Sequence, residues 1–452
     1  MIKKSLLLLF LALGLHFSGY SQDLPEKFDL KMVLKVGLEN NYVIKKSRLD
    51  EDGAAYQRKE IIGSGLPQLN GYGNYNNFLE ISPMGIPGGL FNPDSDPSQI
   101  DVIAFGVPQS VQAGFQLNQL IFSHSYLVGL KAAKTSEEFY LLMTQMSEED
   151  ILYDLAMNYY GIMELELQKQ NLEANLDKLQ NLEKILQVQY ENDLAKKVDY
   201  NRVTVNLTTL QASLDDLEIG ISQGKSYLKL LMGIPIDTTF EVEQENFDLE
   251  MGKLLMIGTQ ADLQNRTDLR LLNKQQELAG LDIKNIQSGY YPSLVGFADV
   301  NYNSFANEFS FLTESKRWYR GSLIGLRLEV PIFDGFQRKN KIAQAKVRRL
   351  KLDQDLNQTS QAADMEYQNA VKKLSSSIRS AEAQKANLGL AEEVYGQTEL
   401  LYTEGLSPLT DLLEAETALR ESRSAYHNQI IQVKTAQIDV YKSTGEIKKM
   451  MD

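Results

Sequence analysis

An internal duplication constrains this chain more than any other feature, because it requires two halves to fold on one plan. Four matched pairs occur in the same order in both halves: residues 40–45 with 265–270, 66–69 with 291–294, 114–117 with 325–328, and Tyr190, Leu194 and Asp199 with Tyr402, Leu406 and Asp411. Chance explains any single match but not four in one order. We therefore expect two repeats that differ mainly in the length of one loop.

Each repeat reads as helix, strand, loop, strand, very long helix, turn and helix. We expect a signal peptide at residues 1–21, a first repeat at 22–235, a linker at 236–253 and a second repeat at 254–452. In the first repeat the expected elements are a helix over 30–63, strands over 66–80 and 109–122, a proline-rich irregular loop over 81–108, and a helical hairpin over 131–232. In the second they are a helix over 254–289, strands over 291–303 and 321–333, and a hairpin over 337–443.

The first residues predict export. Lys3 and Lys4 precede a short apolar run, and small residues lead to Ser21, after which we expect cleavage. An apolar amino-terminal helix of a cytoplasmic protein is the alternative. No later stretch has eighteen or more apolar residues, so any membrane crossing would have to use β-strands.

The second strand of each expected pair, at 109–122 and at 321–333, alternates apolar and polar residues for about a dozen positions, near the length that a tilted membrane strand needs. A soluble sheet with one wet face would show the same alternation. The export signal favours the membrane interpretation. Aromatic residues near the expected strand ends are candidates for interfacial girdles: Tyr72, Tyr75, Tyr302, Trp318 and Tyr319.

The helical stretches are too long for one compact domain. Residues 131–190 contain no proline and one glycine, Gly161, which corresponds to roughly 90 Å of helix. Leucines between Leu165 and Leu186 recur at spacings of three, four and seven, which is typical of a coiled-coil seam. We therefore expect these helices to pack against each other and against further copies of the chain.

The composition argues against catalysis and nucleic-acid binding. The chain has no cysteine, its three histidines are not spaced to share a metal, and its formal charge is −14. No nucleophile and base are paired in the sequence, so we expect neither an enzyme nor a cofactor.

The motifs together resemble the TolC family of outer-membrane efflux and secretion channels. The most diagnostic pieces are VPIFDGF at residues 330–336 and YTEGL at 402–406, which leads to DLLEA at 411–415. The resemblance implies an α+β membrane protein that forms a homotrimer. Each chain would give four β-strands to a twelve-stranded transmembrane barrel in outer-membrane lipid, and long coiled-coil helices to a periplasmic tunnel.

The same resemblance implies the function of an exit duct in a tripartite efflux or type I secretion system. Such a duct docks on a periplasmic adaptor (membrane fusion protein) and an inner-membrane transporter, and its cargo is a drug, a metal ion or a polypeptide. An exported periplasmic coiled-coil scaffold without a membrane barrel is the alternative. A scaffold explains the helices and the charge, but not the paired alternating strands.

Residues at the two helix–helix turns, 191–198 and 403–410, are the candidate functional site. Asp411 and Glu414 lie three residues apart, so both carboxylates project from one helical face, and three copies would make a ring of six acidic groups. Asp411 also stands where a helix amino-terminal cap is expected. By resemblance, the periplasmic gate consists of Asp411, Glu414, Asp199 and Tyr402.

The adaptor-contact tips, also assigned by resemblance, are Gly405, Leu406, Ser407, Pro408, Leu194 and Ala195. Ser407 falls where some family members have an arginine that helps to lock the gate. In the first tip, Asp193 stands where a glycine is common.

Overall fold

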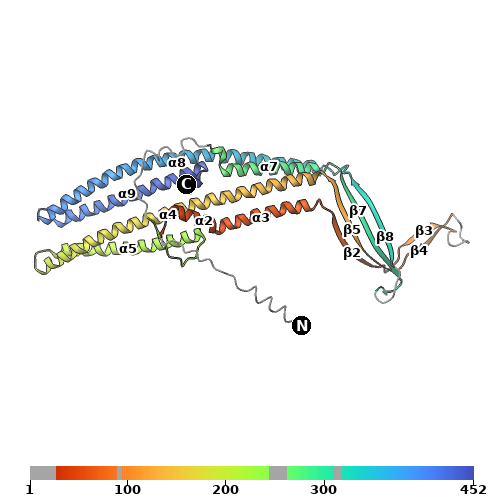
Figure 1. Cartoon of the computed structure of the whole chain (residues 1–452), viewed down its shortest axis with the longest axis horizontal. Helices are drawn as coiled ribbons and strands as arrows, with labels where there is room; N and C mark the ends of the chain where they lie inside the picture. The colour runs from red at the N-terminus through yellow and green to blue at the C-terminus, as the bar shows by residue number, and fades with distance from the viewer. Residues whose placement is uncertain are drawn as a thin grey trace, which may run out of the picture. The chain divides into compact units, whose positions relative to one another are not determined.

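A computed structural model describes residues 27–88, 94, 96, 98–243, 262–309, 311 and 318–451 (Figure 1). The expected signal peptide, most of the linker and parts of both outer loops lie outside these residues. The described chain divides into two compact units. The helical unit takes its residues from Met1–Lys46, Gln145–Arg266 and Gln361–Asp452, and the sheet unit from Ser47–Thr144 and Thr267–Ser360.

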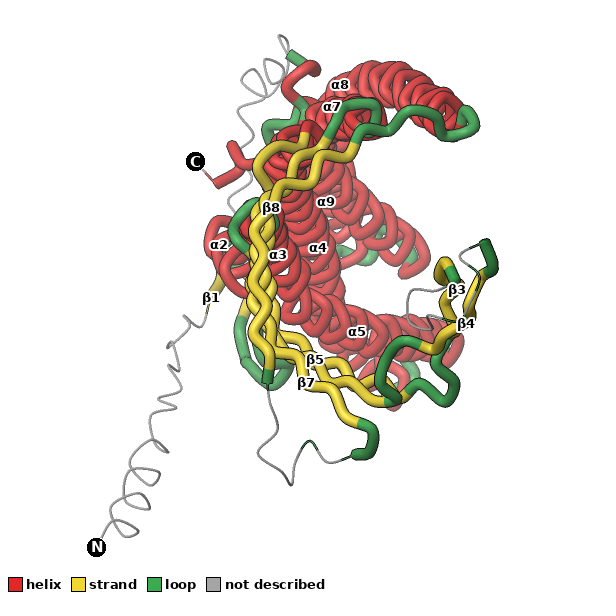
Figure 2. Tube along the Cα trace, turned by 90° about the vertical axis from the view of Figure 1, so that its right-hand side faces the viewer, coloured by secondary structure: helices red, strands yellow, loops and turns green. Residues whose placement is uncertain are grey.

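The sheet unit is built around four antiparallel strands that lie side by side (Figures 1 and 2). Their order is β2 (Gln68–Asn77), β5 (Gln109–Ser123), β7 (Ser293–Ala306) and β8 (Tyr319–Glu329). Each repeat supplies one neighbouring pair, and the β5–β7 pairing joins the two repeats.

The strand register gives this sheet one apolar and one polar face. Leu117 of β5 lies between Leu69 and Ala298, and Ala298 pairs with Ile324, so one row across the sheet is apolar. A polar row includes Tyr72, whose hydroxyl donates to Asp299 Oδ2 over 3.0 Å. The alternation expected from the sequence is therefore continuous across all four strands.

Gly114 lies in this polar row and leaves space above β5 for the Tyr72 side chain. Its register partners are Tyr72 on one side and Asn301 on the other, and a Cβ built on it would lie 2.6 Å from the backbone oxygen of Val300. Because this position has no side chain, the Tyr72 ring on β2 reaches past β5 to Asp299 on β7.

The outer loop expected to be irregular contains a hairpin. Strands β3 (Pro83–Pro87) and β4 (Ile100–Ala104) pair antiparallel, with Pro83 opposite Ala104 and Pro87 opposite Ile100. The two prolines stand at the ends of β3 in a two-stranded ribbon, where a missing N–H costs little pairing. The irregular loop predicted for residues 81–108 is thus wrong.

Helices α2 (Leu30–Asn40) and α3 (Tyr42–Gly63) replace the single helix expected over 30–63. Asn41 interrupts it, with ψ of 133°. Its Oδ1 accepts from the backbone N–H of Val43 at 2.7 Å and caps α3, while its Nδ2 donates to the Leu231 carbonyl at 2.6 Å. A buried asparagine therefore ends one helix, starts the next and ties both to α5 (Lys197–Met232).

The limits of the long helices differ from those expected from the sequence. Helix α4 (His124–Glu191) begins directly after β5 rather than at residue 131, and α8 (Gln337–Thr403) begins after a short extended segment. Strand β8 ends at Glu329, so residues 330–333 are not part of the sheet. Helices α7 (Thr267–Ser288) and α9 (Leu409–Thr444) and the 3-10 turns η1 (Leu263–Asn265) and η2 (Ile447–Met451) complete the helical elements. Within the described ranges, none of the helices has both the length and the apolar character to span a membrane.

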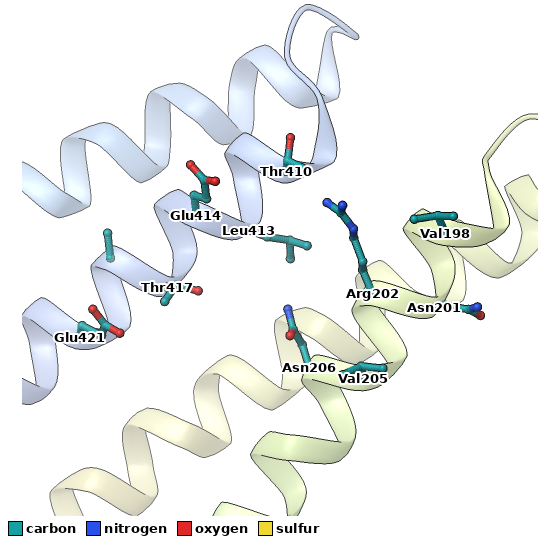
Figure 3. Close-up of a pocket in the computed structure, with 11 residues that line it drawn as sticks. Val198, Asn201, Arg202, Val205, Asn206, Thr410, Leu413, Glu414, Thr417 and Glu421 are labelled. Atoms are coloured by element: carbon teal, nitrogen blue, oxygen red, sulfur yellow. The ribbon is translucent and has the colours of Figure 1, made fainter.

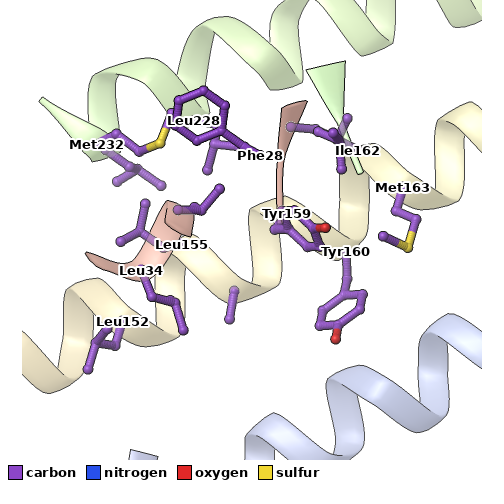
Figure 4. Packing of buried hydrophobic residues seen from close by; sticks show 14 of the residues in the cluster. Phe28, Leu34, Leu152, Leu155, Tyr159, Tyr160, Ile162, Met163, Leu228 and Met232 are labelled. Atoms are coloured by element: carbon purple, nitrogen blue, oxygen red, sulfur yellow. The ribbon is translucent and has the colours of Figure 1, made fainter. Parts of the chain in front are cut away.

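The helical unit has its largest apolar core around the middle of α4 (Figure 4). Leu155 and Tyr159 are fully buried there against Phe28 and Leu228. Phe28 belongs to β1 (Lys27–Phe28), which pairs with β6 (Glu241–Val242). Each fully buried side chain of this size contributes roughly 1.5–3 kcal/mol, so this cluster fixes the base from which the helix tips project. A second cluster, around Leu186, Val203 and Leu412, lies at the tips themselves.

Candidate functional site

The second tip is a tight turn between α8 and α9. Gly405 adopts a φ of +73°, and the N–H of Leu406 donates to the carbonyl of Leu401 at 2.8 Å. This left-handed residue followed by a bond back into the last helical turn is the usual glycine helix ending. Pro408 then precedes α9 with extended backbone.

The first tip, between α4 and α5, repeats this geometry without a glycine. Asp193 has a φ of +60°, and the N–H of Leu194 donates to the carbonyl of Gln189 at 2.7 Å. Asp193 therefore stands in the left-handed conformation that glycine adopts at Gly405. The structure thus explains why this position is one where glycine is common.

Asp411 is not the amino-terminal cap of α9, so that expectation is wrong. The cap is Pro408, whose ring has no atom that can accept a hydrogen bond, and Asp411 lies in the first helical turn. There its carboxylate faces the positive end of the helix dipole. The Ser407 hydroxyl donates to Asp411 Oδ2 over 2.9 Å. The position at which the resemblance expects an arginine in some family members therefore carries an uncharged hydrogen-bond donor to Asp411.

A groove of about 690 Å³ lies between α5 and α9 beside the tips (Figure 3). Its lining follows the duplication, because α5 contributes first-repeat residues to one side and α9 contributes their second-repeat equivalents to the other. The equivalent pairs are Val198 with Thr410, Asn201 with Leu413, Arg202 with Glu414, Val205 with Thr417, and Asn206 with Ala418. Glu414 is exposed in this groove, and Glu421 lines it one turn further along α9.

Arg202 is the functional candidate that the sequence analysis missed. Its side chain extends from α5 toward α9 in the groove (Figure 3), and no described residue forms an ion pair with it. It occupies in the first repeat the position that Glu414 occupies in the second, three residues after Asp199 and Asp411 respectively. Extending the alignment by three residues beyond Asp199 would have found this exchange of charge.

Tyr402 and Asp199 lie close enough to interact electrostatically. Burial raises the pKa of the Tyr402 hydroxyl, and the negative charge of Asp199 raises it further. Tyr402 packs against the apolar cluster at the tips, which includes Leu409 and Leu413. The structure therefore brings the tyrosine of α8 and the aspartate of α5 into one neighbourhood, although it contains no direct hydrogen bond between them among its described contacts.

The residues expected to contact an adaptor are at the ends of the tips. Leu194 and Leu406 are both strongly exposed, and they occupy equivalent positions in the two turns. Gly405 is exposed beside Leu406, whereas Ala195 and Ser407 are partly covered. Two apolar side chains thus project from turns whose backbone is fixed by hydrogen bonds.

Above the tips, α4 and α9 meet through polar side chains. Burial raises the pKa of Glu416, and Arg420, Asn175 and Lys178 oppose that shift. Further along, Asn171 Nδ2 lies 3.1 Å from His427 Nδ1. Burial lowers the pKa of His427, and the neighbouring Arg423 lowers it further. Polar side chains of both helices therefore lie in this seam, beside Leu172 and Leu176, which pack against the tip cluster.

Nothing in this region offers a metal centre. Among the described residues, no three His, Cys, Asp or Glu side chains gather closely enough to hold a metal ion. The chemistry that the tips provide is charge and shape: acidic groups, one arginine and a groove. These are the elements of a passage that selects by electrostatics.

Comparison with known proteins agrees with this architecture. A model described as outer membrane efflux protein matches residues 259–446. Outer membrane protein TolC of Escherichia coli strain K12 is 21% identical over 98% of this chain and 87% of its own length, and TolC of Salmonella enteritidis is similar to the same extent. The chain is similar to the TolC-like outer membrane efflux proteins. The resemblance predicted from the sequence is thereby confirmed.

Solved structures show the same fold as this TolC-like chain. CusC superposes with a TM-score of 0.72 at 16% identity, covering 92% of each chain. The Campylobacter jejuni CmeC outer membrane channel gives 0.72 at 15% identity over 92% of this chain and 85% of its own. The open state of the Neisseria gonorrhoeae MtrE outer membrane channel gives 0.70 at 16%, over 92% and 88%.

Family and fold together make the TolC-like chain a passive outer-membrane exit duct for efflux systems rather than an enzyme. The predicted α+β class and the outer-membrane location with a periplasmic helical part are confirmed. The alternative of a periplasmic scaffold is not supported, because the family is one of outer-membrane channels.

Proposed function

We propose that three copies of this chain form the duct and that its entrance is closed where α5 and α9 of each copy meet at the tips. Family members form homotrimers and work with efflux pumps. The observation that carries the proposal is the groove between α5 and α9, because it is lined by Arg202 of α5 and by Glu414 of α9, and Glu414 lies one helical turn after Asp411.

The proposed gate works by charge at a narrow point. Asp411 and Glu414 from three copies bring six carboxylates to one level, where like charges repel unless cations lie between them. Arg202 supplies three such cations. Tyr402 packs against the apolar tip cluster close to the charge of Asp199, and this proximity of α8 and α5 belongs to the proposed closed arrangement.

The tips themselves are the proposed contact with a periplasmic adaptor, and through it with an inner-membrane transporter. Leu194 and Leu406 are two equivalent exposed apolar side chains in each chain, on turns whose backbone is fixed by hydrogen bonds. Exposed leucines on fixed turns favour docking into apolar pockets of a partner. Gly405, Ser407, Pro408 and Ala195 shape the turns around them.

Single-channel recording tests the gate. Multivalent cations should block current through the reconstituted trimer, because several carboxylates bind one ion more strongly than bulk water does. Asp411→Ala combined with Glu414→Ala should relieve that block and weaken the preference for cations. Asp215→Ala combined with Asp216→Ala removes the same charge from exposed positions of α5 outside the groove, and should leave the block unchanged. Equal block in the wild type and in the Asp411/Glu414 variant would remove these residues from the gate.

A further inference from the structure

The beginning of α8 carries an unusual concentration of positive charge. Seven basic residues and no acidic residue occur between Arg338 and Lys351, although the chain as a whole carries a formal charge of −14. Two of the seven are paired: Arg338 with Asp334 at 3.5 Å, and Arg348 with Asp282 at 2.9 Å. The other five are exposed and have no ion-pair partner among the described residues: Lys339, Lys341, Lys346, Arg349 and Lys351.

An exposed apolar surface leads directly into this basic stretch. Along β8, Ile324, Leu326 and Leu328 share the apolar face of the sheet, and the alternation continues after the strand to Ile332, which is 94% exposed. Since the family places such sheets in the outer membrane, this face is the one that meets lipid. The basic stretch therefore starts where the lipid-facing surface ends.

Two phenylalanines mark the junction between the apolar face and the charges. Phe333 is 76% exposed and Phe336 is 62% exposed, and their rings meet edge to face at 5.6 Å. Phe336 adopts a φ of +64°, which is strained for a residue with a large side chain. Lys339 Nζ lies 5.9 Å from the Phe336 ring centre. The turn thus holds an aromatic pair outward and places a free ammonium group beside it.

We propose that residues 333–351 anchor the chain to anionic phospholipid headgroups at the periplasmic surface of the outer membrane. The phenylalanines enter the boundary between acyl chains and headgroups, and the lysines bind lipid phosphates. This combination of aromatic rings and adjacent cations is what favours a charged membrane surface. The proposal rests on the proposed membrane position of the sheet.

Distance along the helix determines which lysines matter. Headgroup regions add roughly 5–7 Å to each side of the hydrocarbon core, and electrostatic attraction decays over about 8–10 Å. Lys339 and Lys341 lie within about 8 Å of Phe336 along the helix axis, whereas Lys351 lies about 22 Å away. Lys339 and Lys341 should therefore carry most of the preference for anionic lipid, and Lys351 very little.

Fluorescence quenching by brominated lipids tests this directly. Trp318 is the sole tryptophan, so Trp318→Phe gives a silent background for a reporter at Phe336→Trp in the full-length trimer. In bilayers of phosphatidylcholine and phosphatidylglycerol, brominated phosphatidylglycerol should quench this reporter at roughly 25-fold lower mole fraction than brominated phosphatidylcholine. Each lysine should account for about fivefold of that preference.

Matched variants distinguish the lysines from general surface charge. Lys339→Gln combined with Lys341→Gln should bring the lipid preference close to one, and the corresponding double arginine variant should keep it. Lys351→Gln should leave it unchanged. A preference that survives the loss of Lys339 and Lys341, or that is equally reduced by Lys351→Gln, would overturn the proposal.

A second reporter separates this inference from the proposed function. Leu326→Trp places the fluorophore in the middle of the apolar face, where both brominated lipids should quench it equally. No quenching at this position would mean that the sheet is not in the membrane, and the proposed function itself would fail. Quenching at 326 without any anionic preference at 336 would overturn only the headgroup anchor.

Discussion

Reversing the charge of Arg202 should open the entrance. Arg202→Glu makes the first repeat identical to the second at this position, so that the groove holds Glu421 and two equivalent glutamates with no cation. The repulsion within one chain would be multiplied by three in the trimer. We expect more frequent openings and a larger mean conductance than in the wild type.

The magnitude follows from the exposure of the groove. Arg202 and Glu414 are both exposed and form no ion pair with a described residue of one chain, so we assign to their attraction across the groove the range of an exposed pair, about 0.2–1 kcal/mol per copy. Three copies together bias the closed state by about 0.6–3 kcal/mol, which corresponds to roughly 3-fold to 150-fold in the ratio of open to closed channels. Higher salt should shrink the effect, because these charges are screened.

A charge exchange makes the assay decisive. Arg202→Glu combined with Glu414→Arg restores one cation and one acid in positions that the duplication has made equivalent. Planar-bilayer recordings should show the double variant returning toward the wild type, with Lys385→Glu, an exposed reversal on α8, as the control. If the double variant opens as readily as Arg202→Glu alone, the pairing across the groove does not hold the gate.

Other positions give simpler predictions. Gly114→Ala should destabilise the trimer to urea by about 1–3 kcal/mol, because its Cβ would meet a backbone oxygen of β7 at 2.6 Å, whereas Gly73→Ala, with nothing within 4 Å, should be neutral. At the tips, Asp193→Gly should raise and Gly405→Asp should lower thermal stability, each by up to about 1 kcal/mol, since both residues have positive φ. Because the pKa of His427 is lowered in the folded protein, the neutral ring favours the folded state above the usual pKa of histidine. This stabilisation is lost as the pH falls through the lowered pKa. The melting temperature should therefore change less between pH 7 and pH 5 in His427→Gln than in the wild type. An equal change in both proteins would contradict this assignment.

Repetition and periodicity allowed much of the sheet to be predicted. The alternation around Phe115 and Leu326 identified the strands, because a two-residue period is written into local sequence. The break at Asn41 was not predictable in the same way, since half of its role is a bond to Leu231, 190 residues away. The hairpin within residues 81–108 was missed because its prolines permit pairing only as a short ribbon, which composition does not reveal.

The candidate site, like the fold, could be predicted from the sequence only in part. The turn at Gly405 was predictable from residue type, since its left-handed backbone favours glycine. The position of Asp411 one turn inside α9 was not, because Pro408 rather than an acidic side chain starts that helix. Arg202 was overlooked because a lone arginine on an exposed helix has no local signature. Its significance comes from Glu414, its equivalent in the second repeat, which lines the same groove.

The opposite charges at Arg202 and Glu414 show what a fused pair of repeats can do that separate halves cannot. Six identical half-chains arranged around an axis would place six like charges at this level, and the assembly would repel itself. In the proposed trimer of fused halves, the two repeats carry opposite charges at this level, so that Arg202 and Glu414 would alternate around the axis. Once the two repeats could diverge in sequence, repulsion between like charges at this level could be replaced by attraction between opposite charges. A substitution in one repeat could then change the strength of this attraction without altering the other repeat.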